Sequence, residues 1–142
     1  MGKKNADQFQ SIKDLEGKIA AAEKGSAGEN AAVEAIGADG ILIASASQID
    51  TFIEVASGAV ECAVVDILLA QKMVGTGNYD NLIIADIELE SEVYAVGFKK
   101  GSDLTQKVND ALKALYDEGK MLDLATKYGI ENTLLLDTSF TG

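Results

Sequence analysis

Residues 18–37, "KIAAAEKGSAGENAAVEAIG", decide the fold. The first seven residues alternate weakly between polar and apolar, which predicts a short buried strand. Gly25 then turns the chain. The stretch from Ser26 to Gly37 places small apolar residues on one helical face and ends at a glycine, as helices commonly do. A strand that turns directly into a helix is the first half of a βαβ unit.

The alternation of strand and helix continues along most of the chain. Apolar runs predict further strands at 40–45, 59–66, 81–89 and 92–98, with a possible last strand within 131–140. Amphipathic stretches predict helices at 47–58, at 67–75 and, with a break near Gly119, at 102–129. This order predicts an α/β fold: a three-layer, open, mostly parallel sheet with helices on both faces, followed by C-terminal helices.

The chain divides into three parts by this pattern. Residues 1–10 are polar and are predicted to be a loose linker. Residues 11–91 are predicted to form an α/β unit, with a turn or short helix at 14–17. Residues 92–142 are predicted to be a crossover strand followed by C-terminal helices.

Composition excludes several classes of function. The chain has 142 residues, of which 47% are hydrophobic and 25% are charged, so it can bury a core. Its net charge of −11 argues against a nucleic-acid partner, because such proteins need a basic face. All the cations are lysines. Within this chain, no arginine can clamp a carboxylate, and histidine-based acid–base or zinc chemistry is impossible. No cofactor and no metal site are indicated.

Cys62 is the single cysteine, so no internal disulfide can form. It lies in the apolar run "VECAVVD", which predicts a small buried side chain rather than a reactive thiol. The polar start "MGKKNADQFQ" predicts no signal peptide, and no apolar run approaches the ~20 residues of a membrane span.

One candidate site is the turn from the first strand into the first helix. The backbone N–H groups of Ser26, Ala27 and Gly28 would lie at a helix N-terminus, which can hold an anion such as a carboxylate without a cationic side chain. The alternative is that Ser26 only caps its own helix, with Glu29 completing a capping box.

Asp66 is the second candidate, because it ends a buried strand just before a helix. It could bind an ammonium, a metal or a hydroxyl, or it could only cap the following helix. Glu23, at the end of the first strand, could face the same crevice or lie in solvent. The acidic stretch 85–92 is interpreted as a solvated face, since its carboxylates lack a calcium-loop spacing.

Three segments, in order, resemble one family. "DLEGKIAAAEKGSAGE" (14–29) is similar to the pattern DLxGKxVAVxxGTxxE, and "SGAVECAVVD" (57–66) is similar to xGxVDAVVxD. "YAVGFKKGSDLTQKVNDALKALYDEGKMLDLATKYG" (94–129) is similar to the closing segment of the same proteins. These are the solute-binding proteins of bacterial amino-acid ABC transporters, that is, bacterial solute-binding family 3 with the type 2 periplasmic-binding fold.

The resemblance implies a fold and a ligand. Family members close two α/β lobes around an amino acid; residues 11–91 resemble the second lobe, and residues from 92 resemble the segment that completes the first. The first half of that first lobe has no counterpart, which implies a truncated chain. By position, Ser26, Ala27 and Gly28 would meet the ligand carboxylate, Asp66 its ammonium, and Glu23 a polar or cationic side chain. The family's carboxylate-clamping arginine, from the first lobe, is absent.

The resemblance also implies partners and a location. The expected function is the substrate-binding component of an amino-acid importer, without enzymatic activity, outside the cell or in the periplasm and associated with a membrane permease. The helices of 102–129 are expected to fold back on the lobe or to exchange in a domain-swapped homodimer. The alternatives are a dehydratase-like enzyme of the same fold, of the cyclohexadienyl or arogenate type, and an isolated lobe that no longer binds ligand.

Overall fold

The computed structural model describes residues 1–89 and 93–134. The chain forms two compact units, Met1–Glu92 and Val93–Gly142. Each unit has its own secondary structure, and the candidate site residues all lie in the first.

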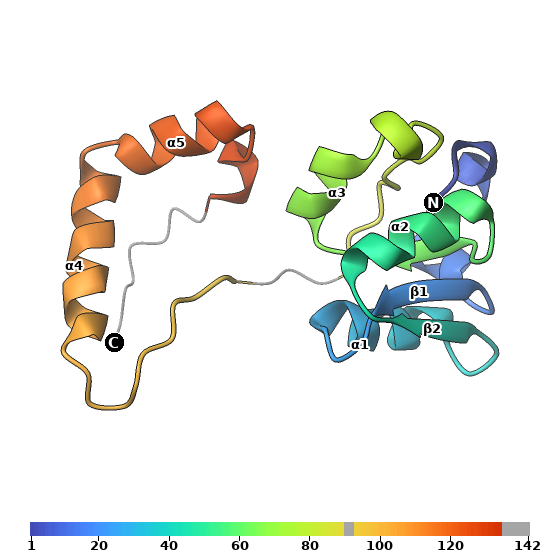
Figure 1. The fold of residues 1–142 in the computed structure, drawn as a ribbon, viewed down its shortest axis with the longest axis horizontal. Helices are drawn as coiled ribbons and strands as arrows, with labels where there is room; N and C mark the ends of the chain where they lie inside the picture. The colour runs from blue at the N-terminus through green and yellow to red at the C-terminus, as the bar shows by residue number, and fades with distance from the viewer. Residues whose placement is uncertain (90–92, 135–142) are drawn as a thin grey trace. The chain divides into compact units, whose positions relative to one another are not determined.

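A three-stranded parallel sheet forms the centre of the first unit (Figure 1). Its strands are β1 (Ile19–Glu23), β2 (Ile41–Ser45) and β3 (Cys62–Val64), in the order β2-β1-β3. β1 therefore pairs on both edges, with Ala20 opposite Leu42 on one side and opposite Cys62 on the other. The predicted parallel sheet is confirmed.

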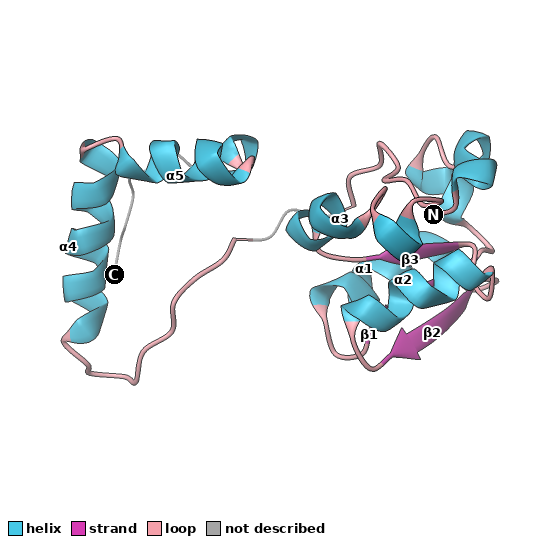
Figure 2. Ribbon diagram, turned by 45° about the horizontal axis from the view of Figure 1, so that its top comes forward, coloured by secondary structure: helices cyan, strands magenta, loops and turns pink. Residues whose placement is uncertain are grey.

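The helices of the first unit cover both faces of this sheet (Figure 2). They are α1 (Ala27–Ile36), α2 (Gln48–Ser57) and α3 (Ile67–Met73), followed by the 3-10 turn η3 (Gly77–Tyr79). The connection from β1 leads to β2 on one side of β1, and the connection from β2 passes over β1 to reach β3 on its other side. Because both crossovers are expected to be right-handed, opposite directions place α1 and α2 on opposite faces. The predicted three-layer α/β architecture is confirmed.

The alternation of side chains in β1 divides the core into two clusters. Ala20 faces a cluster that includes Ala35 and Ile36 of α1, whereas Ala21 faces a cluster that includes Phe52 and Val55 of α2. Ala20, Ala21 and Ala22 are all 0% exposed. Successive residues of a strand point to opposite faces, so this one short strand supplies the floor of both clusters.

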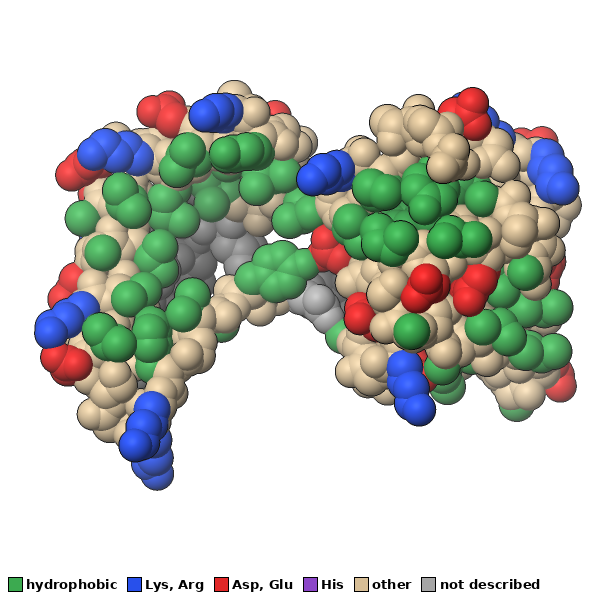
Figure 3. Space-filling model, in the orientation of Figure 1, with side chains coloured by type: hydrophobic (Ala, Val, Ile, Leu, Met, Phe, Trp, Pro, Cys, Tyr) green, Lys and Arg blue, Asp and Glu red, His purple; other side chains and the backbone are tan. Residues whose placement is uncertain are grey.

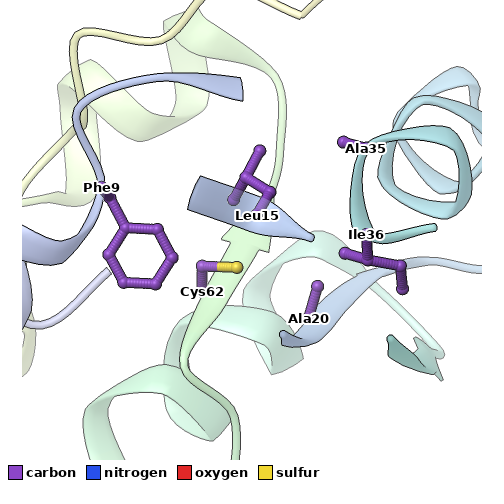
Figure 4. Packing of buried hydrophobic residues seen from close by; sticks show 6 residues of the cluster. All are labelled: Phe9, Leu15, Ala20, Ala35, Ile36 and Cys62. Carbon is purple, nitrogen blue, oxygen red and sulfur yellow. The ribbon is translucent and has the colours of Figure 1, made fainter. Parts of the chain in front are cut away.

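Cys62 belongs to the cluster on the α1 side (Figure 4), where it lies among Phe9, Leu15 and Ala20. Burial, with a smaller contribution from the neighbouring Glu61 carboxylate, raises the pKa of its thiol to about 11. The predicted burial of the cysteine is confirmed.

The prediction that residues 1–10 form a loose linker is wrong. Lys3–Gln8 forms a 3-10 helix, η1, and Phe9 is only 2% exposed. The backbone N–H of Lys3 donates to the carbonyl of Asn81 at 2.8 Å. Phe9 buries an aromatic ring in the core, which outweighs the polar character of its neighbours. The expected short helix after it is present as η2 (Ile12–Leu15).

Two predicted strands are absent from the described residues. Residues 81–89 make only a single antiparallel bridge, between Gly2 and Leu82. Ala85, Ile87 and Leu89 pack against the cluster on the α1 side, so the alternation is real, but no neighbouring strand supplies a ladder of hydrogen bonds. Residues 93–98 likewise form no strand.

β3 is shorter than the predicted 59–66 because backbone N–H groups on both sides of it form hydrogen bonds outside the sheet. The N–H of Ala59 donates to Glu54 at the end of α2, and the N–H of Asp66 donates to the side chain of Gln48.

The second unit is a pair of helices, α4 (Leu104–Asp117) and α5 (Lys120–Tyr128), followed by the 3-10 turn η4 (Glu131–Thr133). Gly119 separates the helices with a φ of 74°, a left-handed conformation that favours glycine. The predicted break is confirmed. The possible strand within 131–140 lies largely outside the described residues, and its described part holds η4.

We expect Phe52→Ala to lower the free energy of unfolding by about 3–5 kcal/mol, since the ring is 3% exposed and its removal leaves a cavity against Ala21. Ile53→Ala is the matched control: the neighbouring side chain is 54% exposed, so its loss should cost only about 0.5 kcal/mol. Urea unfolding followed by far-UV circular dichroism measures both. Equal losses for the two variants would contradict the core described above.

We expect the folded chain to react very slowly with a thiol reagent at about pH 8, because the raised pKa of Cys62 leaves little thiolate and its side chain is 5% exposed. In urea, one thiol per chain should react at the rate of a free cysteine. Reaction of the folded chain at that same rate would contradict the buried position of Cys62.

Candidate functional site

The candidate site lies at the carboxyl edge of the sheet, where β1 and β3 end side by side. The helices that follow them leave toward opposite faces: α1 packs in the cluster with Ala20, and Leu69 of α3 packs in the cluster with Ala21. Neighbouring strands whose helices diverge leave a crevice between them. In open α/β sheets, ligands bind at such a point.

The turn between β1 and α1 is held by its own side chains. The Ser26 hydroxyl donates to the carbonyl of Glu23 at 2.7 Å and accepts the N–H of Glu29 at 3.0 Å. The Glu29 carboxylate accepts the N–H of Gly25 at 2.6 Å. Ser26 is thus the N-cap of α1, and the cap anticipated from sequence is present, with the carboxylate reaching Gly25 rather than Ser26.

The first residues of α1 lie against the end of β3. Ala27 and Gly28 open the helix, so their N–H groups precede any intrahelical acceptor and carry the positive end of the helix dipole. A Cβ atom on Gly28 would lie 3.4 Å from the carbonyl oxygen of Val64. The absence of a side chain at Gly28 therefore keeps the mouth of α1 open beside the end of β3.

Asp66 follows β3 by two residues and caps α3. Its Oδ1 accepts the N–H of Leu69 at 3.0 Å, while its own N–H donates to Oε1 of Gln48 at 2.8 Å. The residue is half-buried. The cap is observed, and it coexists with a carboxylate at the sheet edge.

Glu23 is the last residue of β1 and is half-buried. Its register partner is Ser45, the last residue of β2, which is 5% exposed and donates its hydroxyl to Glu54 at 2.8 Å. The side chain of Glu23 thus begins at the same edge as Ser26 and Asp66.

The five residues singled out from sequence lie on two neighbouring connections of one sheet edge. One connection carries Glu23, Ser26, Ala27 and Gly28, and the other carries Asp66. Backbone N–H groups at a helix start suit an anion, and a carboxylate suits a cation. The two connections thus carry the two kinds of group that suit the opposite charges of a zwitterion.

Two hollows among the described residues have linings that include none of the candidate site residues. One hollow, of about 180 Å³, is bordered by Phe9, Ile83 and Asp86, among others. Another, of about 200 Å³, is bordered by Glu16, Gly37 and Asp39 at the opposite, amino edge of the sheet. Ala27 is exposed, and the other four candidate residues are half-buried, so the candidate site is an edge open to solvent.

Within residues 1–89 and 93–134, no three histidine, cysteine or acidic side chains are grouped to hold a metal ion. None of the helices described in these ranges combines the length and apolar character needed to cross a membrane. The predicted acidic face at 85–92 is described only to residue 89, and there its apolar members are partly buried.

Gln48 and Ser45 were not predicted from the sequence as residues of this edge. Both act through side-chain hydrogen bonds to residues that are distant in sequence, Asp66 and Glu54. A glutamine at the first position of a helix is an ordinary surface choice, so no local signal distinguishes Gln48. For Ser45, the one hint in the sequence was its place at the end of the apolar run 40–45.

No model of a known protein family matches the chain. The chain is 29% identical, over 122 residues, to the arginine-binding extracellular protein ArtP of Bacillus subtilis (strain 168). The match covers 84% of this chain and 48% of ArtP, so the chain spans about half the length of that relative.

A solved structure gives the same relationship. The amino acid ABC transporter substrate-binding protein AbpA of Streptococcus pneumoniae, crystallised with L-arginine, is 28% identical, with a TM-score of 0.74. The match covers 92% of this chain and 56% of AbpA. Both relatives are binding proteins. The chain is thus related, over about half their length, to the amino-acid substrate-binding proteins of ABC transporters, and its sheet and helices have the fold of one lobe of a type 2 periplasmic binding protein.

Proposed function

We propose that this chain is an amino-acid-binding part of an ABC importer's substrate-binding component. The observation that carries the proposal is the pairing, on one sheet edge, of the open N-terminus of α1 with the carboxylate of Asp66. An α-amino acid needs an anion site and a cation site a few ångströms apart. Both relatives described above bind amino acids or arginine by name.

The ligand carboxylate would accept hydrogen bonds from the N–H groups of Ala27 and Gly28, beside the Ser26 hydroxyl. The helix dipole supplies positive charge there, so no cationic side chain of this lobe is needed. The ligand ammonium would lie against Asp66, whose backbone N–H donates to Gln48 and whose Oδ1 accepts the N–H of Leu69. Hydrogen bonds between charged groups are about twice as strong as neutral ones.

We propose a cationic amino acid, such as arginine, as the ligand. Glu23 lies at the same edge and can face the ligand side chain. The first 92 residues carry six lysines and sixteen carboxylates, a balance that attracts cations by long-range electrostatics. The names of the two relatives point to the same ligand.

The open edge implies weak binding by this chain alone. A carboxylate held only by helix N–H groups remains exposed to water on its other side, and water weakens each charged contact. In the complete binding protein, a second lobe would cover the ligand. The protein would then act outside the cell or in the periplasm, at the membrane, and would deliver its ligand to the permease of the transporter.

We also propose that the apolar faces of α4 and α5 pair with those of a second copy. Figure 3 shows hydrophobic side chains gathered on the surface of these helices. The large apolar side chains exposed there are Leu104, Leu115, Leu122, Leu124 and Tyr128. Residues 93–134 carry six lysines and six carboxylates, so two such units do not repel each other. Exposed apolar faces of this kind usually mark an interface.

We expect calorimetric titration to detect weak binding of L-arginine, and Asp66→Asn to weaken it about tenfold or more, because the amide keeps the cap but loses the charge. Asp14→Asn is the control: this carboxylate also caps a helix, through Ser11, but lies in η2 away from the edge. It should bind as the unchanged chain does. Unaltered binding by Asp66→Asn would contradict the assignment, and no binding of any amino acid would indicate a ligand-incompetent lobe.

We expect light scattering to give the mass of a dimer, and Leu115→Asp together with Leu122→Asp to give a monomer, because charges are costly in an apolar interface. The control places a charge on an exposed apolar side chain of the first unit, Val33→Asp, and should leave the dimer intact. A monomeric unchanged chain would contradict the proposed pairing.

A further inference from the structure

A hydrogen bond between residues distant in sequence holds the backbone of Asp66, whose carboxylate is the proposed ammonium-binding group. Oε1 of Gln48, the first residue of α2, accepts the N–H of Asp66 at 2.8 Å, across 18 positions of sequence. A backbone N–H can only donate, so the amide oxygen of Gln48 must face Asp66. This bond joins the start of α2 to the start of α3.

The backbone of Gln48 is itself fixed. Ser47 caps α2 by accepting the N–H of Asp50 and donates its hydroxyl to the Asp50 carboxylate at 2.8 Å. Thr51, which is 0% exposed, donates its hydroxyl to the carbonyl of Gln48 at 2.7 Å. The amide of Gln48 therefore extends from a helical turn that is held on both sides.

The backbone N–H of Asp66 needs a hydrogen-bond acceptor that neither β3 nor α3 supplies. β3 ends at Val64, so the sheet ladder does not reach the N–H of Asp66, and α3 begins only at Ile67. Gln48 supplies that acceptor, and Leu69 holds Oδ1 of the carboxylate. With its backbone N–H and one carboxylate oxygen both bonded, Asp66 has little freedom to turn away from the edge.

We propose that Gln48 is a positioning residue for amino-acid binding, which holds the Asp66 carboxylate where it meets the ligand ammonium; this rests on the function proposed above. Gln48 does not itself bind the ligand. Its loss lets Asp66 adopt other orientations, so the cost falls on the ammonium contact and leaves the rest of the ligand's contacts unchanged.

The test compares two ligands and two variants by calorimetric titration. Gln48→Met keeps the length of the side chain but removes the acceptor, whereas Gln48→Glu keeps an acceptor oxygen. The ligands are L-arginine and 5-guanidinopentanoate, which lacks the α-ammonium. We expect Gln48→Met to weaken L-arginine about tenfold and to leave 5-guanidinopentanoate unchanged, and Gln48→Glu to restore most of the loss.

Gln106→Met is the matched control, since Gln106 also bonds through its side chain, to Asp110, but lies in α4. It should bind both ligands as the unchanged chain does. Equal weakening of both ligands by Gln48→Met would indicate a general structural role and overturn the inference, as would unchanged binding of L-arginine. An unchanged chain that binds no α-amino acid would overturn the proposed function and this inference with it, so the two failures are distinguishable.

Discussion

The first unit depends on the complete burial of the three central residues of one short strand, on both faces of the sheet. β1 is the central strand of the sheet, and Ala20, Ala21 and Ala22 are inaccessible to solvent. Each alanine lets a helix approach the sheet closely, and alternate residues receive helices from opposite sides. A strand with small side chains in this position is therefore a packing requirement, and the three-layer architecture follows from it.

The central position of β1 also creates the candidate site. Since β2 and β3 lie on its two sides, the chain must cross over β1, and the helices after β1 and β3 leave in opposite directions. Their N-termini meet at the carboxyl edge, where Gly28 lies close to Val64. The same crossing that closes the core thus leaves one edge without a covering helix, and that edge carries unpaired helix N–H groups beside a carboxylate.

Sequence periodicity predicted most of this architecture, because three strands and five helices each carry their own pattern of apolar residues. Periodicity failed where a segment's structure depends on a neighbouring strand or on packing against the core. The stretch 81–89 alternates correctly, and Ala85, Ile87 and Leu89 are partly buried, but a strand also needs a neighbour, which no local pattern reveals. Phe9 was missed for the opposite reason: one aromatic residue within a polar segment is enough to fix that segment to the core.

The candidate site likewise has residues that the sequence could identify and one that it could not. Ser26 and Asp66 could be identified because both stand where a strand ends and a helix begins. Capping and ligand binding were treated as alternatives for them, yet the geometry makes them compatible. The Ser26 hydroxyl accepts the N–H of Glu29, which leaves the N–H groups of Ala27 and Gly28 for the proposed ligand, and Oδ1 of Asp66 accepts the N–H of Leu69.

A cap fixes the orientation of the side chain that forms it, and a fixed carboxylate binds an ammonium without first losing rotational freedom. The residue that completes this arrangement, Gln48, lies in another helix and forms its bond across the sheet edge. Its role exists only once α2 and α3 are packed together, which is why sequence reasoning found the groups that would bind the ligand and missed the one that holds them. The proposed positioning of Asp66 depends on the tertiary structure, whereas the proposed binding groups lie in two local strand–helix turns, which the sequence could identify.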